Sequence, residues 1–180
     1  ATTKINTLAG SLNRFTQVEQ LSNGNILFTW DTGLFSGSEY VMRRFTMNGT
    51  AVDANQISIR TLAGITTAEY ECKIATNANG KFMLFISSNG QNYKAMIFNN
   101  DAAMPNSVFV PAQAGPTNTH YDKTTYIKTL PNGKFLLVYR KQLTTDVATR
   151  SIAYKIYNDD GTIAKDEVVY NTIYSWGYIG

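Results

Sequence analysis

Four carboxylates are the residues of this sequence that could break a covalent bond together. They are Asp31, Glu39, Glu69 and Glu71, which lie in or beside apolar, strand-like segments. Hydrolysis of a glycosidic bond uses a pair of carboxyl groups, and such pairs come from distant positions in a chain. The spacing of these four neither selects a pair nor excludes one, so a glycoside hydrolase stays open as an alternative function.

The other reactive side chains form no catalytic or metal-binding pattern. His120, the single histidine, lies in a polar connection and has no nucleophile motif beside it. Cys72 is the single cysteine, which excludes an internal disulfide and fits a small buried side chain. The segment Asn158–Gly161 lacks the alternating donors of a calcium loop, and a β-turn explains it. We therefore predict no catalysis, no metal and no cofactor.

A second set of side chains suits binding. Trp30 and Asp31 leave one strand-like segment together, and Tyr139 and Arg140 leave another. Arg44 falls where a side chain should face inward, so it either bridges backbone carbonyls or contacts a ligand. Trp and Tyr offer flat apolar rings for sugars, and they also dominate contacts between proteins. The predicted ligand-binding residues are Trp30, Asp31, Arg44, Tyr139, Arg140 and Trp176.

Composition indicates short strands joined by tight turns. Charged residues make up only 16% of the 180 residues, and Thr and Asn supply much of the remaining polarity. The net charge is +3, and Lys and Arg are scattered rather than clustered, which argues against a nucleic-acid footprint. No apolar run has the length of a membrane span.

The elements that must position these side chains occur three times. Asn23-Gly24, Asn79-Gly80 and Asn132-Gly133 recur at intervals of about 50 residues, which is typical of repeat architectures. Asn-Gly between apolar runs is a strong hairpin signal. The apolar run after each Asn-Gly has almost no polar alternation, so we expect it to be buried on both faces and innermost in its repeat.

Each repeat divides into four strand-like runs, and no segment has a convincing helical period. The first runs are 14–21, 68–76 and 121–130, and the second runs are 25–31, 81–87 and 134–141. The third runs are 39–46, 92–99 and 150–158, and the fourth runs are 56–62, 107–112 and 167–172. We predict a single domain with an extra strand at 1–10, repeats at 11–64, 65–115 and 116–172, and a tail at 173–180.

Four further motifs are the linker Ile5-Asn6-Thr7, the strand end Phe28-Thr29-Trp30, the segment Arg43–Thr50 and the turn Asp159-Asp160-Gly161-Thr162. Together they resemble the repeats of large secreted bacterial proteins of the haemolysin-type and adhesin-like classes. The resemblance implies propeller-blade-like units of four antiparallel strands. Three such units do not close a ring, so we expect a homo-oligomer or part of a longer repeat array. A β-trefoil is the alternative fold.

The resulting functional prediction is an extracellular binding module without catalysis, lectin-like or adhesin-like, that recognises a glycan or a cell-surface partner. The start Ala1-Thr2-Thr3, without Met, fits a processed, secreted chain as well as a trimmed one. The alternatives are a self-associating scaffold and a glycoside hydrolase on a propeller scaffold. No nucleic acid and no membrane span are expected.

Overall fold

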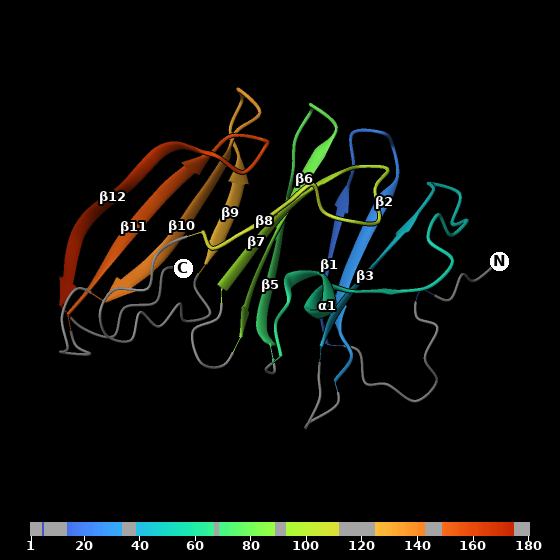
Figure 1. Cartoon of the computed structure of the whole chain (residues 1–180), viewed down its shortest axis with the longest axis horizontal. Coiled ribbons are helices and arrows are strands. Elements are labelled where there is room, and N and C mark those ends of the chain that lie inside the picture. Colours follow the sequence, from blue (N-terminus) through green and yellow to red (C-terminus); the bar gives the residue numbers. More distant parts are fainter. Residues whose placement is uncertain are drawn as a thin grey trace.

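The computed structural model describes residues 5, 14–33, 39–66, 69–88, 93–111, 125–142 and 149–174. Within them the chain forms three four-stranded antiparallel sheets, which lie side by side (Figure 1). This confirms the prediction of an all-β chain with three four-stranded antiparallel repeats. These residues show neither a closed propeller nor a trefoil.

Each sheet takes its strands from one stretch of sequence. Sheet 1 holds β1 (Arg14–Gln20), β2 (Ile26–Asp31), β3 (Tyr40–Phe45) and β4 (Ile57–Ser58), in that order. Sheet 2 holds β5 (Glu69–Thr76), β6 (Lys81–Ser88), β7 (Tyr93–Asn99) and β8 (Ser107–Phe109). Sheet 3 holds β9 (Tyr126–Thr129), β10 (Phe135–Gln142), β11 (Thr149–Tyr157) and β12 (Ile163–Tyr174).

The three Asn-Gly turns join the first and second strands as the sequence predicts. Gly24, Gly80 and Gly133 have φ of 85°, 82° and 80°, a region that glycine enters without a steric cost. The backbone N–H of Gly24 donates to the Leu21 carbonyl at 2.9 Å, which closes the turn. The turn chemistry therefore fixes where each hairpin reverses.

The second strands are interior to their sheets, but they are not the innermost strands of the molecule. The first strand of sheet 2, β5, contacts both β1 and β9, so the first strands line up next to one another. The second strand is thus interior within each repeat, as predicted, while the first strands make the contacts between neighbouring sheets. Burial on both faces holds for β6, in which residues 82–87 are all buried, but not for β10, in which alternate residues are only half-buried.

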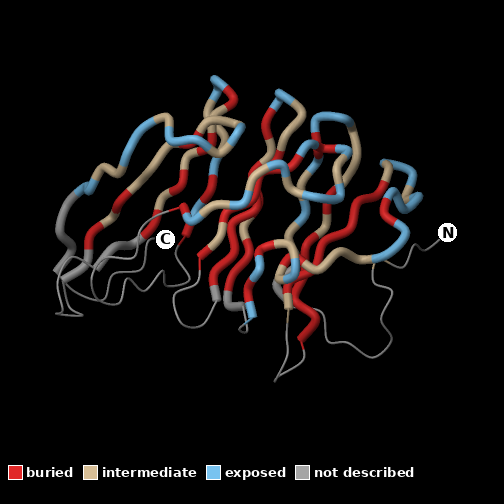
Figure 2. Tube along the Cα trace, viewed as in Figure 1, coloured by how far each residue is buried: buried red, intermediate tan, exposed pale blue. Residues whose placement is uncertain are grey.

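Two apolar cores lie between the sheets, and their buried residues are red in Figure 2. The first core, between sheets 1 and 2, includes Leu27, Met42, Cys72 and the stacked rings of Phe82 and Phe98. The second core, between sheets 2 and 3, includes Met83, Phe85, Ile97, Phe135, Leu137 and Tyr139. Alternate residues of β6 thus serve opposite cores, as the pleat of a strand requires.

The predicted strand at 56–62 is wrong for most of its length. The chain leaves β4 at Ser58 and forms the helix α1 (Ile59–Ala63). Ser58 caps the helix by accepting a hydrogen bond from the Thr61 backbone N–H, and Gly64 ends it with φ of 65°. These two capping residues are the signal that the strand prediction missed. Ile59 and Ala63 are buried in the first core.

The last strand is longer than the sequence predicts. β12 begins at Ile163 and continues through Tyr174, so it extends past the expected end at 172 into the expected tail. Of the predicted extra strand at 1–10, only Ile5 belongs to the described residues. No helix among the described residues is long and apolar enough to cross a membrane.

Candidate functional site

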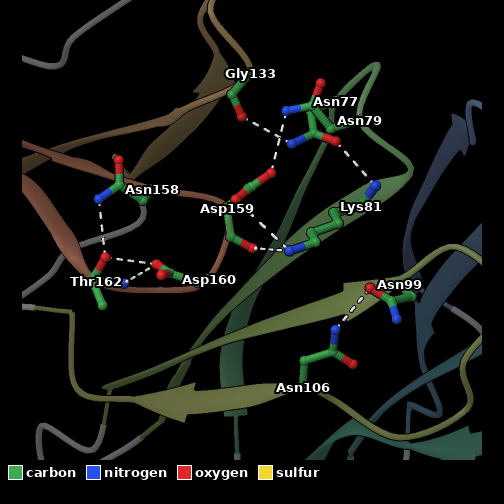
Figure 3. Close-up of polar contacts among 10 residues, drawn as sticks. All are labelled: Asn77, Asn79, Lys81, Asn99, Asn106, Gly133, Asn158, Asp159, Asp160 and Thr162. Carbon is green, nitrogen blue, oxygen red and sulfur yellow. Dashed lines mark hydrogen bonds and ion pairs between the residues drawn. The ribbon is translucent and has the colours of Figure 1, made fainter.

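The hairpin ends of sheets 2 and 3 are tied together by polar contacts. Asn77 Nδ2 donates to the Gly133 carbonyl at 2.8 Å, and Asn79 Nδ2 lies 3.2 Å from an Asp159 carboxylate oxygen (Figure 3). Lys81 Nζ donates to the Asp159 backbone carbonyl at 3.0 Å. These groups satisfy one another, so this end of the sheets serves to join them.

Arg44 makes the corresponding connection between sheets 1 and 2. Its Nη2 lies 2.5 Å from Asp53 Oδ1, and its Nη1 donates to the Asn100 carbonyl at 2.9 Å. Both members of the ion pair are buried, with side chains 3% and 7% exposed. Arg44 therefore bridges carbonyl and carboxylate groups, and its donors are not turned toward a ligand.

The opposite end of the sheets, here called the open end, is where the first strands begin and the second strands finish. By backbone position, all four acidic residues singled out from the sequence lie at this end. Asp31 ends β2, Glu39 directly precedes β3, and Glu69 and Glu71 lie at the start of β5. The antiparallel topology therefore gathers distant acids at one end, which spacing alone could not show.

Glu71 is the acid with the most unusual surroundings. Its side chain is buried between sheets 2 and 3, with only 6% of the residue exposed. Burial raises the pKa of its carboxyl above the ordinary value, whereas Lys73 and Thr125 act to lower the pKa. Lys73 Nζ lies 3.3 Å from Oε1. The other oxygen, Oε2, has no hydrogen-bond partner among the described residues, so it can donate or accept elsewhere.

One further buried hydroxyl near this end also lacks a partner within the described ranges. It belongs to Ser151, which lies on β11 and is 0% exposed, whereas Thr125, which precedes β9 and is 1% exposed, interacts with Glu71. A buried polar group without a partner costs free energy, and functional sites are where such groups are tolerated. Glu71, Thr125 and Ser151 lie on the facing surfaces of sheets 2 and 3, which makes this side of the open end the best candidate site.

Tyr139 lies on the same face of sheet 3 and is 1% exposed. Its hydroxyl contacts the Glu167 carboxylate on β12, so this predicted ligand-binding residue packs in the second core. Trp30 is also buried, at 2% exposed, on the outer face of sheet 1. Neither ring is a surface aromatic of the kind that the sugar-stacking prediction required.

Two other acids at the open end have protein partners. Asp31 Oδ1 accepts a hydrogen bond from the Gly33 backbone N–H at 2.8 Å, and Asp31 is 9% exposed. Glu39 Oε2 accepts a hydrogen bond from the Ser58 hydroxyl at 3.1 Å. Asp31 is thus held in a fixed orientation at the end of its strand, and its second oxygen is available.

The remaining predicted site residues are not placed. Trp176 and His120 lie outside the described residues, and so does the side chain of Arg140, whose backbone belongs to β10. The described part of the chain holds no group of three His, Cys, Asp or Glu side chains that could bind a metal ion. The turn at Asp160 is a β-turn in which the Thr162 N–H donates to the Asp160 carboxylate at 2.8 Å.

No family model and no curated protein matches the sequence. A solved structure with a similar fold is the alpha-L-arabinofuranosidase PaAbf62A from Podospora anserina in complex with cellotriose. The similarity has a TM-score of 0.52 at 12% sequence identity and covers 84% of this chain. The chain spans about half of that structure, 48% of its length. An arabinofuranosidase is a glycoside hydrolase.

This comparison corrects the functional prediction. The prediction of a lectin-like or adhesin-like module is wrong, because the solved structure that shares the fold is a glycoside hydrolase. The comparison favours the hydrolase alternative instead. It has no bearing on the resemblance to haemolysin-type and adhesin-like repeats, which stays a prediction.

Proposed function

We propose that the three sheets are neighbouring blades of a propeller-type glycoside hydrolase and that Glu71 is its proton donor. The observation that carries this proposal is the Glu71 carboxyl itself, which is buried, raised in pKa and unpaired at Oε2. A general acid of a glycosidase needs a pKa high enough to keep its proton near neutral pH. The structural similarity to an arabinofuranosidase supports the same class of reaction.

The chemistry requires two carboxyl groups with different tasks. The protonated Glu71 would donate its proton to the glycosidic oxygen as the bond between that oxygen and the anomeric carbon breaks. A water molecule would attack the anomeric carbon, and a second carboxylate would take the proton of that water. Hydrolysis then yields two sugars with no other reactant, and Glu71 is reprotonated from solvent.

We name Asp31, at the end of β2 in sheet 1, as the second carboxylate, in a site that would extend across the open end from sheet 1 to the space between sheets 2 and 3. It is largely buried at the same end of the sheets, and the Gly33 N–H holds one of its oxygens. Glu39 is less suited, since the Ser58 hydroxyl already binds it and its position lies one strand farther out.

The substrate would be a glycan. The neighbouring structure is an arabinofuranosidase and contains cellotriose, so α-L-arabinofuranosides and cello-oligosaccharides are the first compounds to test. A polysaccharide substrate would also fit the secretion that we predicted from the sequence. An oligomeric or longer assembly stays a prediction.

The test compares substrates whose leaving groups differ in how much they need protonation by a general acid. The purified chain should hydrolyse a glycoside from a panel that includes 4-nitrophenyl α-L-arabinofuranoside and unactivated arabinose-substituted oligosaccharides. Glu71→Gln should lower kcat/KM for the unactivated substrates by about 100-fold or more, because general acids contribute on this order. The loss should be smaller for the nitrophenyl glycoside, whose leaving group needs little protonation.

Asp166→Asn is the matched control, since it makes the same change at a carboxylate on β12 that is 82% exposed and far from the cores. It should leave kcat/KM unchanged for both kinds of substrate. An inactive wild-type chain would overturn the hydrolase proposal. An equal loss on both substrates in Glu71→Gln would overturn the proton-donor role.

A further inference from the structure

The outer face of sheet 3, the one turned away from sheet 2, is apolar along its two central strands, and no other described sheet lies against it. Its side chains are half-buried, whereas the facing side chains of the same strands are buried in the second core. They form an entirely apolar, shallow recess of about 330 Å³. The recess is lined by Leu130, Leu136, Val138, Ile152, Tyr154 and Ile156, with Tyr170 at its edge.

The register of the strands identifies this face. Leu27, Met83 and Leu136 each lie four residues after the Asn of their hairpin turn. Leu27 packs in the first core and Met83 in the second, so each one faces the next sheet along the row, and both are 0% exposed. Leu136 occupies the same position but is half-buried. The outer face of sheet 3 is therefore the face that sheets 1 and 2 use to bind their successors.

The partners of these residues on the third strands repeat the pattern. Met83 pairs with Ile97, and Leu136 pairs with Ile156 at the same step of the ladder. Ile97 is 0% exposed, whereas Ile156 is half-buried. The two central strands of sheet 3 thus present the same kind of surface that is buried between sheets 2 and 3.

The polar contacts at the hairpin end also indicate that a further sheet could follow sheet 3. Lys81 reaches from sheet 2 to the Asp159 carbonyl of sheet 3, at the turn between the third and fourth strands. Lys134 lies two residues after its turn Asn, as Lys81 does. Within the described ranges the Lys134 ammonium group makes no hydrogen bond or ion pair. In a further sheet with a similar turn, a backbone carbonyl equivalent to that of Asp159 would accept a hydrogen bond from this ammonium group.

We infer that this face docks a fourth four-stranded antiparallel sheet, whose facing side chains have the apolar character of Phe82, Leu84 and Ile86 in sheet 2. The inference rests on the blade arrangement but does not depend on catalysis. It extends an interface that already occurs twice in the molecule, with side chains at the same register.

A second copy of the chain, stacked head to tail, fits this face less well. The corresponding face of sheet 1 is already covered over β3, since Val41 and Phe45 are 1% and 3% exposed. Arg43 lies over the Phe45 ring and donates to the carbonyls of Ile5 and Ala54, both at 3.0 Å. A second copy would have to displace these contacts before its sheet 1 could bind.

The experiment adds a fourth sheet whose sequence is taken from the chain itself. The full chain is extended after residue 180 by a second copy of residues 65–112, which carry the strands of sheet 2. We expect a monomer that melts at least about 4 °C above the wild-type chain. Val138→Asp should remove most of that gain, yet change the melting temperature of the three-sheet chain by less than about 2 °C, since Val138 is half-exposed there.

Val18→Asp is the control, because Val18 is 55% exposed on β1 and lies in sheet 1. It should have the same small effect on the three-sheet and four-sheet chains. The inference is wrong if the added sheet brings no gain in melting temperature, or if Val138→Asp costs the same in both chains. It is also wrong if the three-sheet chain dimerises and Val138→Asp abolishes the dimer, since the occupant would then be a second copy.

Discussion

Replacing Arg44 by Met tests whether the buried ion pair joins the first two sheets. The substitution keeps the volume of the aliphatic stem but leaves the Asp53 carboxylate buried, 7% exposed, without its cation. It also removes the donor to the Asn100 carbonyl. Breaking a buried pair by removing one partner costs about 3–5 kcal/mol, and we expect a loss in this range for the free energy of unfolding. Urea unfolding followed by tryptophan fluorescence would measure it.

Asp53→Leu and the double variant separate the effect of an unpaired buried charge from the effect of altered packing. Asp53→Leu leaves Arg44 buried and unpaired, so it should be about as destabilising as Arg44→Met. The double variant removes both charges, and it should be more stable than either single variant, because apolar residues of similar size can replace a buried pair at little cost. Ile97 and Ile156 already fill the Arg44 position in sheets 2 and 3. An Arg44→Met chain within about 1 kcal/mol of wild type would refute the reasoning, as would a double variant less stable than both singles.

Two further predictions concern single side chains. Gly161→Ala should lower the free energy of unfolding by about 1–3 kcal/mol more than Gly24→Ala. Both glycines have positive φ, 90° and 85°, but only at Gly161 would the new Cβ lie 2.7 Å from Ser107 Oγ. Equal losses of the two variants in urea unfolding would contradict this prediction. Burial raises the pKa of Glu71, so its contribution to stability is present below the unfolded pKa and is lost as the pH rises through the folded pKa. The melting temperature of Glu71→Gln should therefore fall less between pH 4 and pH 8 than that of wild type, and parallel curves would contradict the shift.

The sequence was sufficient for the sheets because their signals are local. The three Asn-Gly turns need positive φ at glycine, and the apolar runs that follow have a strand period, so element type and order could be predicted. The helix α1 was missed because five residues are too few for a helical period, and only Ser58 and Gly64 mark its ends. The length of β12 was missed because its polar residues, such as Lys165 and Asp166, interrupt the apolar pattern.

The candidate site was harder to predict, since it depends on contacts between sheets. Glu71 was one of four acids in the sequence, and nothing local distinguishes it from Glu69 two residues earlier. Its burial comes from the packing of sheet 3 against sheet 2, which sequence periodicity does not specify. Arg44 shows the same limit, because its position in an inward-facing column was evident but its partner Asp53 was not.

Cys72 allows the opening of the first core to be measured. It is the chain's single cysteine, it is 3% exposed, and it packs between sheets 1 and 2 rather than between sheets 2 and 3. A thiol-specific reagent can reach it only when those two sheets separate or the chain opens more widely. The rate of its modification therefore reports the parting of one particular pair of sheets, and comparison with the global unfolding rate shows whether the row opens sheet by sheet or all at once.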